Sequence, residues 1–223
     1  EPHVGGHAMV SGGNVALGGG TVAQKKYGIE DSPDLLFRDL TDWSVVQPNG
    51  FPDYRYNDRE IIRAFADHSA ATYDFLVRHG VVFVDKAPDA QGGISVGNSA
   101  PRVNHAALMD WPRIQTGAQI DPGQRAVFSS GNGLMRPLEA TAQRIGVEIL
   151  LEHRMVALHR DGERGRVTGV SVEANGVRTA IRARKGVFVG TGGSAGNVNF
   201  RRIFDPRLTE EYCGQLGEPW SKK

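Results

Sequence analysis

The pattern that most restricts the fold of this chain is a run of three segments in which apolar and polar residues alternate. The segments are Met155–His159, Val167–Ala174 and Val177–Arg184, and such alternation is typical of β-strands with one buried face. The dipeptide Asn175-Gly176 separates the second segment from the third. It favours a two-residue hairpin turn, because both of its residues readily adopt a positive φ. The pattern predicts a three-stranded antiparallel meander.

Helical patterns dominate the sequence ahead of the meander. Ser32 is a good N-cap and Pro33 suits a first helical position, so a helix is predicted from Pro33 into Trp43. A longer helix is predicted for NDREIIRAFADHSAATYDFLVRHG, which has apolar residues at steps of three and four and ends at Gly80. Another is predicted for GNGLMRPLEATAQRIG, with Pro137 tolerated only near its first turn.

Short apolar runs accompany these helices and are interpreted as strands. They cover residues 81–85, 147–153 and 186–190, whereas the residues from about 86 to 130 are irregular and rich in Gly, Pro, Asn and Gln. Helices and short strands alternate in this part of the chain. The predicted fold class is therefore α/β, with the antiparallel meander as an appendage.

The first twenty residues contain seven glycines, a density that costs backbone entropy and therefore calls for a reason. They form the pairs Gly5-Gly6 and Gly12-Gly13 and the triplet Gly18–Gly20. Apolar residues stand between them, whereas flexible linkers are usually polar throughout. We interpret the segment as a ligand loop, whose bare backbone N–H groups suit pyrophosphate oxygens or the polar edge of a flavin.

A second glycine turn, GTGGSAG, follows the apolar run at 186–190. Its G-x-S-x-G pattern matches the nucleophile elbow of serine hydrolases, but no histidine follows Ser194 to complete a triad in the usual order. Its G-x-G-x-x-A pattern matches a dinucleotide fingerprint, but no apolar strand leads to the acidic pair Glu210-Glu211. We therefore interpret it as a glycine turn laid against a bound cofactor and not as a complete nucleotide-binding fold.

Charge and cysteine content argue against several classes of protein. A net charge of +1 argues against binding to nucleic acid or to an anionic membrane surface, because proteins that bind these partners usually concentrate Lys and Arg on one face. The single cysteine, Cys213, allows no intramolecular disulfide. No apolar stretch is long enough to span a membrane. We expect a cytoplasmic protein, or a periplasmic one if a signal sequence was removed upstream of residue 1.

The order of six segments resembles that of the FAD-dependent flavoproteins of the fumarate reductase and succinate dehydrogenase group. This group includes flavocytochrome fumarate reductases and ketosteroid dehydrogenases, and the similar segments are GGHAMVSGGN, GIEDSPDLLFRD, FLVRHGVVF, GNGLMRPLEATAQRIGVEIL, RVTGVSVEANG and IRARKGVFVGTGGSAGN. The resemblance implies FAD as the cofactor and a Rossmann-like FAD-binding domain of the glutathione-reductase type. It also implies a small-molecule substrate and hydride transfer between the flavin and a C–C bond next to a carbonyl or carboxylate.

The resemblance also assigns cofactor contacts to this chain, but no catalytic residue and no metal ligand. The contacts are Gly5, Gly6, His7, Ser11, Gly12 and Gly13 at the pyrophosphate and isoalloxazine, Met155 at the adenine edge, and Thr191, Gly192 and Gly193 at the adenosine. Succinate dehydrogenases attach FAD covalently through a histidine near the position of His7. The spacing from His7 to Gly12 is closer to that of the non-covalent members, so we expect non-covalent FAD.

The resemblance further implies that residues 1–223 form a single incomplete FAD-binding domain. Its expected parts are a glycine-rich cofactor loop at 1–30, helices plus a strand at 31–85, an irregular region at 86–130, a helix, the meander and the second glycine turn at 131–200, and the start of a connection to a missing clamp domain at 201–223. We expect such a fragment to be inactive alone and to self-associate through exposed strand edges. The alternative is a non-enzymatic glycine-rich binding module.

Overall fold

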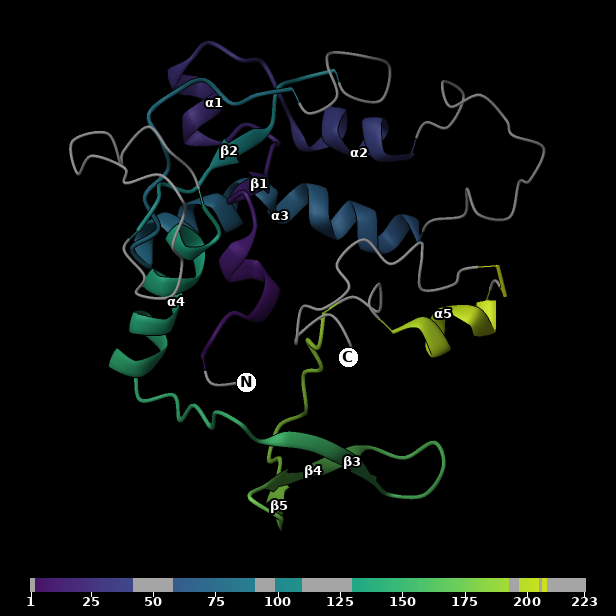
Figure 1. The fold of residues 1–223 in the computed structure, drawn as a ribbon. Helices are drawn as coiled ribbons and strands as arrows, with labels where there is room; N and C mark the ends of the chain where they lie inside the picture. Colours follow the sequence, from purple (N-terminus) through teal and green to yellow (C-terminus); the bar gives the residue numbers. More distant parts are fainter. Residues whose placement is uncertain are drawn as a thin grey trace. The chain divides into compact units, whose positions relative to one another are not determined.

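The computed structural model of the chain describes residues 3–41, 58–90, 99–109, 130–192, 197–204 and 206–207. These residues belong to two compact units (Figure 1). One unit is Ala8–Val147, and the other combines Glu1–His7 with Glu148–Lys223. Helices and strands are present in the chain, as the predicted mixed fold class requires.

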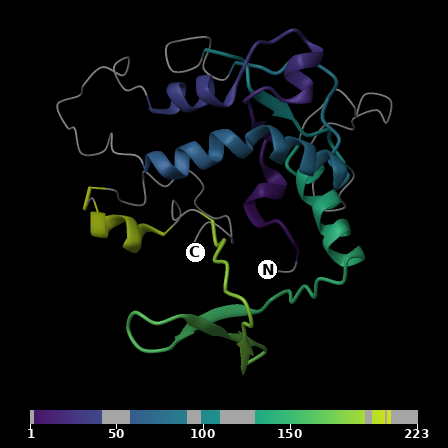
Figure 2. The ribbon, with the colours of Figure 1, turned by 180° about the vertical axis from the view of Figure 1, so that it is seen from behind.

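The unit Ala8–Val147 is mainly helical and carries one short sheet. In chain order its elements are the 3-10 helix η1 (Gly6–Val10, which begins just before the unit), β1 (Asn14–Ala16), α1 (Val22–Lys26), α2 (Pro33–Thr41), α3 (Arg59–Arg78), β2 (Val103–His105) and α4 (Asn132–Arg144). The strands β1 and β2 pair in antiparallel fashion, with Asn14 opposite His105 and Ala16 opposite Val103. The helices α2 and α3 lie side by side in both views (Figures 1 and 2).

Helix ends in this unit follow the predicted local signals. The Ser32 hydroxyl accepts a hydrogen bond from the Leu35 N–H at 3.1 Å, so Ser32 caps α2 as expected. At the start of α3 the Asp58 carboxylate accepts the N–H groups of Glu60 and Ile61. The helix ends before Gly80, whose φ of 90° is in the left-handed region that favours glycine. These helices are therefore specified largely by residues next to them in sequence.

The helix α4 differs from the prediction at Pro137, which lies in its second turn and not its first. A proline there removes the hydrogen bond that an N–H would donate to the Gly133 carbonyl. Pro137 is nevertheless buried and lies beside Gly80, where a Cβ would be only 3.5 Å from the Pro137 Cβ. Close packing at the end of α3 therefore accompanies this irregularity in α4.

The core of the unit lies between the short sheet, α3 and α4. Its buried members are Leu17, Tyr73, Leu76, Val81 and Ala106, and the Tyr73 and Phe83 rings stack with centroids 4.7 Å apart. The strand predicted at 81–85 is wrong, because this run forms only a single bridge, from Phe83 to Ala106. The chain bends at Asp85 and Lys86 directly after the bridge, so the two segments do not stay adjacent long enough to form a ladder.

The other unit contains the predicted meander. Its strands β3 (Arg154–Arg160), β4 (Val167–Ala174) and β5 (Val177–Arg182) form one antiparallel sheet in the order β3-β4-β5. Asn175 and Gly176 form the turn between β4 and β5 with φ of 51° and 76°, as the hairpin signal predicted. A short helix, α5 (Val198–Phe204), follows later in the chain.

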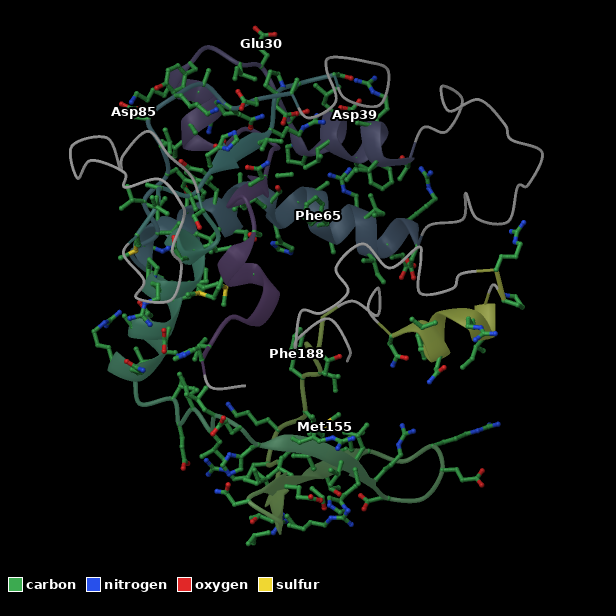
Figure 3. All side chains as sticks on the ribbon, in the orientation of Figure 1. Glu30, Asp39, Phe65, Asp85, Met155 and Phe188 are labelled. Carbon is green, nitrogen blue, oxygen red and sulfur yellow. The ribbon has the colours of Figure 1, made fainter. Side chains whose placement is uncertain are left out.

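Two further strand predictions in or next to this unit are wrong. Residues 147–153 form irregular structure with a turn at Leu151 and Glu152, and residues 186–190 are irregular as well. Apolar side chains suit a strand, but a strand also requires a backbone partner, and among the described residues neither run pairs with a strand. Phe188, in the second of these runs, is 97% exposed (Figure 3).

Candidate functional site

The turn Ser11–Gly13 is the part of the predicted cofactor loop with the clearest geometry. It directly follows η1, and the Ser11 hydroxyl donates to the Ala8 carbonyl at 2.9 Å. Ser11 and Gly12 are exposed, whereas Gly13 is buried with φ of 72°. The turn therefore presents one polar side chain and one glycine on the surface, above a glycine that is part of the packed interior.

The start of α4 closes against this turn. The Gly131 N–H donates to the Ser11 carbonyl at 2.9 Å, and a Cβ on Gly131 would lie only 1.6 Å from the Ala8 oxygen. A Cβ on Gly13 would lie 2.5 Å from the Ser130 carbonyl carbon. Only glycine allows two backbones to approach so closely. Sequence analysis missed Ser130 and Gly131, although a glycine at the predicted helix start was a visible signal.

The Gly12 amide is available to a ligand. Among the residues that the structure describes, its N–H donates to no protein group, and the position is exposed. A Cβ on Gly12 would meet only the Asn14 Oδ1, at 3.8 Å. Nothing in the packing requires a glycine here, so the absence of a side chain fits a backbone that must come close to a bound molecule.

The triplet Gly18–Gly20 has a different role from the Ser11–Gly13 turn. The Gly18 N–H donates to the Ser69 hydroxyl at 3.0 Å, and the Gly19 N–H donates to the Asp31 carboxylate at 2.8 Å. The Gly20 N–H donates to the Gln24 side-chain oxygen at 3.0 Å. All three amides are therefore used within the protein and are not available to pyrophosphate.

A buried polar cluster accepts the Gly19 and Gly20 amides, and Arg102 lies at its centre. Arg102 Nε and one terminal nitrogen donate to the two Asp31 oxygens, both at 2.8 Å, and the other terminal nitrogen donates to Asp39 at 2.6 Å. The side chains of Asp31 and Arg102 are 0% and 8% exposed. The Gln24 amide donates to Asp31 and to the Pro101 carbonyl. Figure 3 shows Asp39 on α2.

The cluster lowers the pKa of both carboxyl groups. Burial alone would raise the pKa of Asp31, but hydrogen bonds from Arg102, Gln24 and the Gly19 N–H outweigh it and hold the pKa below its ordinary value. The same balance holds for Asp39, where burial raises the pKa and hydrogen bonds from Ser99 and Arg102 lower it further than burial raises it. Both carboxylates are therefore charged in the folded protein at neutral pH.

We expect the free energy of unfolding to stay level down to about pH 5 and to fall below about pH 4. A carboxylate whose folded-state pKa is depressed contributes stability above its unfolded pKa and loses it as the pH falls through the folded pKa. Urea unfolding at a series of pH values measures this. For Asp39→Asn, the difference in free energy from the wild type should shrink as the pH falls. A difference that stays constant into strong acid would contradict the assignment.

The remaining predicted contacts lie in the other unit. Gly5 and Gly6 have φ of 104° and 47°, as glycines at a turn commonly do. His7 belongs to η1 and the placement of its side chain lies outside what the structure describes. The covalent or non-covalent state of FAD at His7 therefore stays a prediction.

The second group of predicted contacts lies on and after the meander. Met155 on β3 pairs with Val172 and its side chain is 41% exposed (Figure 3). Thr191 and Gly192 are exposed, and Gly192 has φ of 82°. Gly193 lies outside the described residues. That this group and the Ser11–Gly13 turn hold one cofactor stays a prediction.

The described residues also bear on metal binding and on membrane insertion. Within the described ranges, no group of three or more His, Cys, Asp or Glu side chains could hold a metal ion. None of the helices in the same ranges combines the length and the apolar character needed to cross a membrane.

Comparison with known proteins identifies a family. Residues 1–221 match the FAD binding domain family. The acrylate reductase flavoprotein subunit of Shewanella woodyi is 26% identical over 214 residues, which are 90% of this chain and 35% of that protein. FAD is the cofactor that these matches support.

Solved structures share the fold. The 3-ketosteroid-Δ4-(5α)-dehydrogenase of Rhodococcus jostii RHA1, solved in complex with 4-androstene-3,17-dione, superposes with a TM-score of 0.69 and 28% identity over 96% of this chain and 46% of its own. The open conformation of a flavocytochrome c3 fumarate reductase superposes with a TM-score of 0.67, over 92% of this chain and 30% of its own, and at 22% identity it shows the fold alone. The chain thus spans about a third to a half of these proteins.

Proposed function

Because this chain belongs to the FAD binding domain family, we propose that the protein containing it is an FAD-dependent oxidoreductase that transfers a hydride between the flavin and a C–C bond. We place this bond next to a carbonyl or carboxylate. Acrylate has a double bond next to a carboxylate and 4-androstene-3,17-dione has one next to a ketone, so the names of two similar proteins share this chemistry. When bound, the flavin supplies the hydride chemistry and the protein supplies binding and orientation.

The observation that carries the proposal is the geometry at Gly12. Its exposed N–H has no protein acceptor among the described residues, and no packing constraint explains the missing side chain. An exposed amide of this kind suits a phosphate oxygen or a flavin carbonyl. In our proposal Ser11 and Gly12 contact the cofactor and the buried Gly13 holds the turn in place beneath them. The contacts predicted at Gly5, Gly6, His7, Met155, Thr191, Gly192 and Gly193 complete the site.

The structure fits such a role because the turn is rigid below its exposed surface. Gly13 is fixed beneath Ser130, and its carbonyl accepts the Ala106 N–H at 2.9 Å. The Ser11 carbonyl is occupied by Gly131. A cofactor would meet a Gly12 amide whose position is set before binding, which lowers the entropic cost of association. The fold detail that goes with this proposal is a Rossmann-like FAD domain of the glutathione-reductase type.

We expect Gly12→Val to weaken FAD binding without unfolding the protein. The added side chain has space within the protein, so the change in stability should stay within about 0.5 kcal/mol. It would occupy the space the cofactor needs, and overpacking of about 1–3 kcal/mol corresponds to a loss of roughly 5- to 150-fold in FAD affinity. Titration of apoprotein with FAD measures the affinity, and urea unfolding measures the stability.

The experiment uses protein that includes the residues encoded on both sides of this chain. The matched control is Gly186→Val, at another exposed glycine whose Cβ would meet nothing within 4 Å; it should bind FAD like the wild type. Wild-type protein that purifies without visible flavin absorbance and takes up no FAD would overturn the proposal and favour the non-enzymatic binding module. Holoprotein that transfers no hydride from reduced flavin to unsaturated acids or ketones, and none from their saturated counterparts to oxidised flavin, would overturn the reaction while leaving FAD binding intact.

A further inference from the structure

The sheet that carries the Ser11–Gly13 turn is too small to define its own register. The strands β1 and β2 have three residues each and form a two-stranded sheet. Isolated two-stranded pairs are marginal in water. Val103 and Asn104 of β2 are buried, but no residue of β1 is, so the side chains of β1 specify its register only weakly. A slip of one residue would move Gly13 by about 3.3 Å along the strand. Something outside the ladder must therefore fix the position of the turn.

Residues 102–106 hold the whole segment between the two glycine groups. The Leu17 N–H donates to the Arg102 carbonyl at 3.0 Å, and the Ala106 N–H donates to the Gly13 carbonyl at 2.9 Å. The ladder between β1 and β2 lies between these two hydrogen bonds. The buried side chain of Asn104 adds a bond to the Leu17 carbonyl at 3.3 Å. Val84 and Asp89 form backbone hydrogen bonds along the other edge of the same segment. Arg102, at the end of the segment that pairs with Leu17, is therefore one of several residues that fix the position of Gly13.

Arg102 is fixed by its own side chain. Its guanidinium binds both oxygens of Asp31 and one oxygen of Asp39, with distances of 2.6–2.8 Å. The same Asp31 carboxylate accepts the Gly19 N–H at 2.8 Å. It therefore binds both Arg102, which directly precedes β2, and Gly19, which lies shortly after β1. A planar guanidinium with two partners admits one arrangement, whereas an ammonium group admits many.

We infer that Arg102 is a positioning residue for the cofactor turn, which it holds through β2 and through Asp31; this inference rests on the proposed function. Stability alone is a weak explanation for the cluster, since apolar residues of similar volume often replace a buried ion pair without loss. The side chain of Arg102 forms its hydrogen bonds with Asp31 and Asp39 and not with the Ser11–Gly13 turn. Its effect on FAD is to keep the β1 register, and with it the Gly12 amide, in one place.

The test is Arg102→Lys in protein that includes the sequence on both sides of this chain. Lysine keeps the charge but cannot bind Asp31 through two parallel hydrogen bonds. Outer-shell partners of bound metals contribute about 10- to 100-fold to affinity, and we expect Arg102→Lys to weaken FAD binding by a similar factor. We also expect a changed visible circular dichroism spectrum and a changed reduction potential of the flavin that remains bound.

Two controls separate positioning from loss of stability. Leu36→Ala truncates a side chain on α2 that is 4% exposed and should lower the melting temperature while leaving FAD affinity and the flavin spectrum unchanged. Arg63→Lys alters an arginine that also binds two carboxylates, but its partners Asp34 and Asp67 are exposed, with side-chain exposures of 93% and 49%. It should leave every readout unchanged.

Each outcome decides the inference. Wild-type affinity and spectrum in Arg102→Lys would overturn it while leaving the proposed function intact, and so would equal FAD loss in Leu36→Ala at the same melting temperature. Wild-type protein that binds no FAD would overturn the proposed function and this inference together. If Arg102→Lys does not fold, Asp39→Ala removes one acceptor of the guanidinium; unchanged FAD affinity in that variant would then overturn the inference.

Discussion

Replacing Asp31 with alanine is expected to lower the free energy of unfolding by about 3–5 kcal/mol, the cost of leaving a buried charge without its partner. The Asp31 carboxylate is fully buried and accepts hydrogen bonds from Arg102, from the Gln24 side chain and from the Gly19 N–H. In the variant these donors lose their acceptor in a place where water cannot readily replace it. Urea unfolding followed by far-ultraviolet circular dichroism measures the loss.

The matched control for this prediction is Asp34→Ala. Asp34 also pairs with an arginine, Arg63, at 2.9 Å, but its side chain is 93% exposed. Exposed pairs contribute about 0–1 kcal/mol, so this variant should unfold near the wild-type urea concentration. Similar losses in Asp31→Ala and Asp34→Ala would show that burial of the Arg102 cluster does not set its contribution to stability.

The elements that sequence analysis predicted correctly are those with local causes. Ser32 caps α2 from three residues away, and Asn175 and Gly176 determine the β4–β5 turn by their own φ values. Both signals concern residues within one turn of each other, so no knowledge of the rest of the fold was needed. The meander is likewise a chain of neighbouring pairings, which keeps its order readable from sequence.

The failed strand predictions share a non-local cause. The runs at 81–85, 147–153 and 186–190 have the side chains of buried strands, but whether such a run becomes a strand depends on a backbone partner elsewhere. For Phe83 the partner is Ala106, and only one bridge forms. For Phe188 no described strand lies alongside. The hydrophobic pattern of a run indicates that its side chains tend to be buried. It does not indicate which other segment of the chain could pair with its backbone.

The candidate site shows the same division. The family resemblance assigned Ser11, Gly12 and Gly13 to the cofactor, but the density of glycines alone could not assign different roles to neighbouring glycines. The Gly18 N–H donates a hydrogen bond to the hydroxyl of Ser69, which is 51 positions away in the sequence. The Arg102 cluster was missed altogether, because Asp31 lies 71 positions from Arg102 and nothing in the spacing of the two indicates contact.

The two neighbouring glycines of the turn offer a direct test of this division of roles. Gly13→Val is expected to lower the free energy of unfolding by about 2–6 kcal/mol, the sum of the cost of a side chain at positive φ and the cost of overpacking. Gly13 has φ of 72°, and an added Cβ would lie 2.5–2.7 Å from three backbone atoms of Ser130. Backbone cannot move aside as a flexible side chain can, so the strain must spread to the start of α4 or to β1.

Comparison with Gly12→Val then separates the structural glycine from the ligand-binding one. Gly13→Val should unfold at a clearly lower urea concentration and lose FAD as a consequence, whereas Gly12→Val should lose FAD at nearly unchanged stability. Unfolding of Gly13→Val at the wild-type urea concentration would mean that Ser130 does not lie over this turn. The contact between Gly13 and Ser130, which places the start of α4 against the turn, would then be wrong. The Gly12 amide would in that case not be held in the position on which FAD binding depends in our proposal.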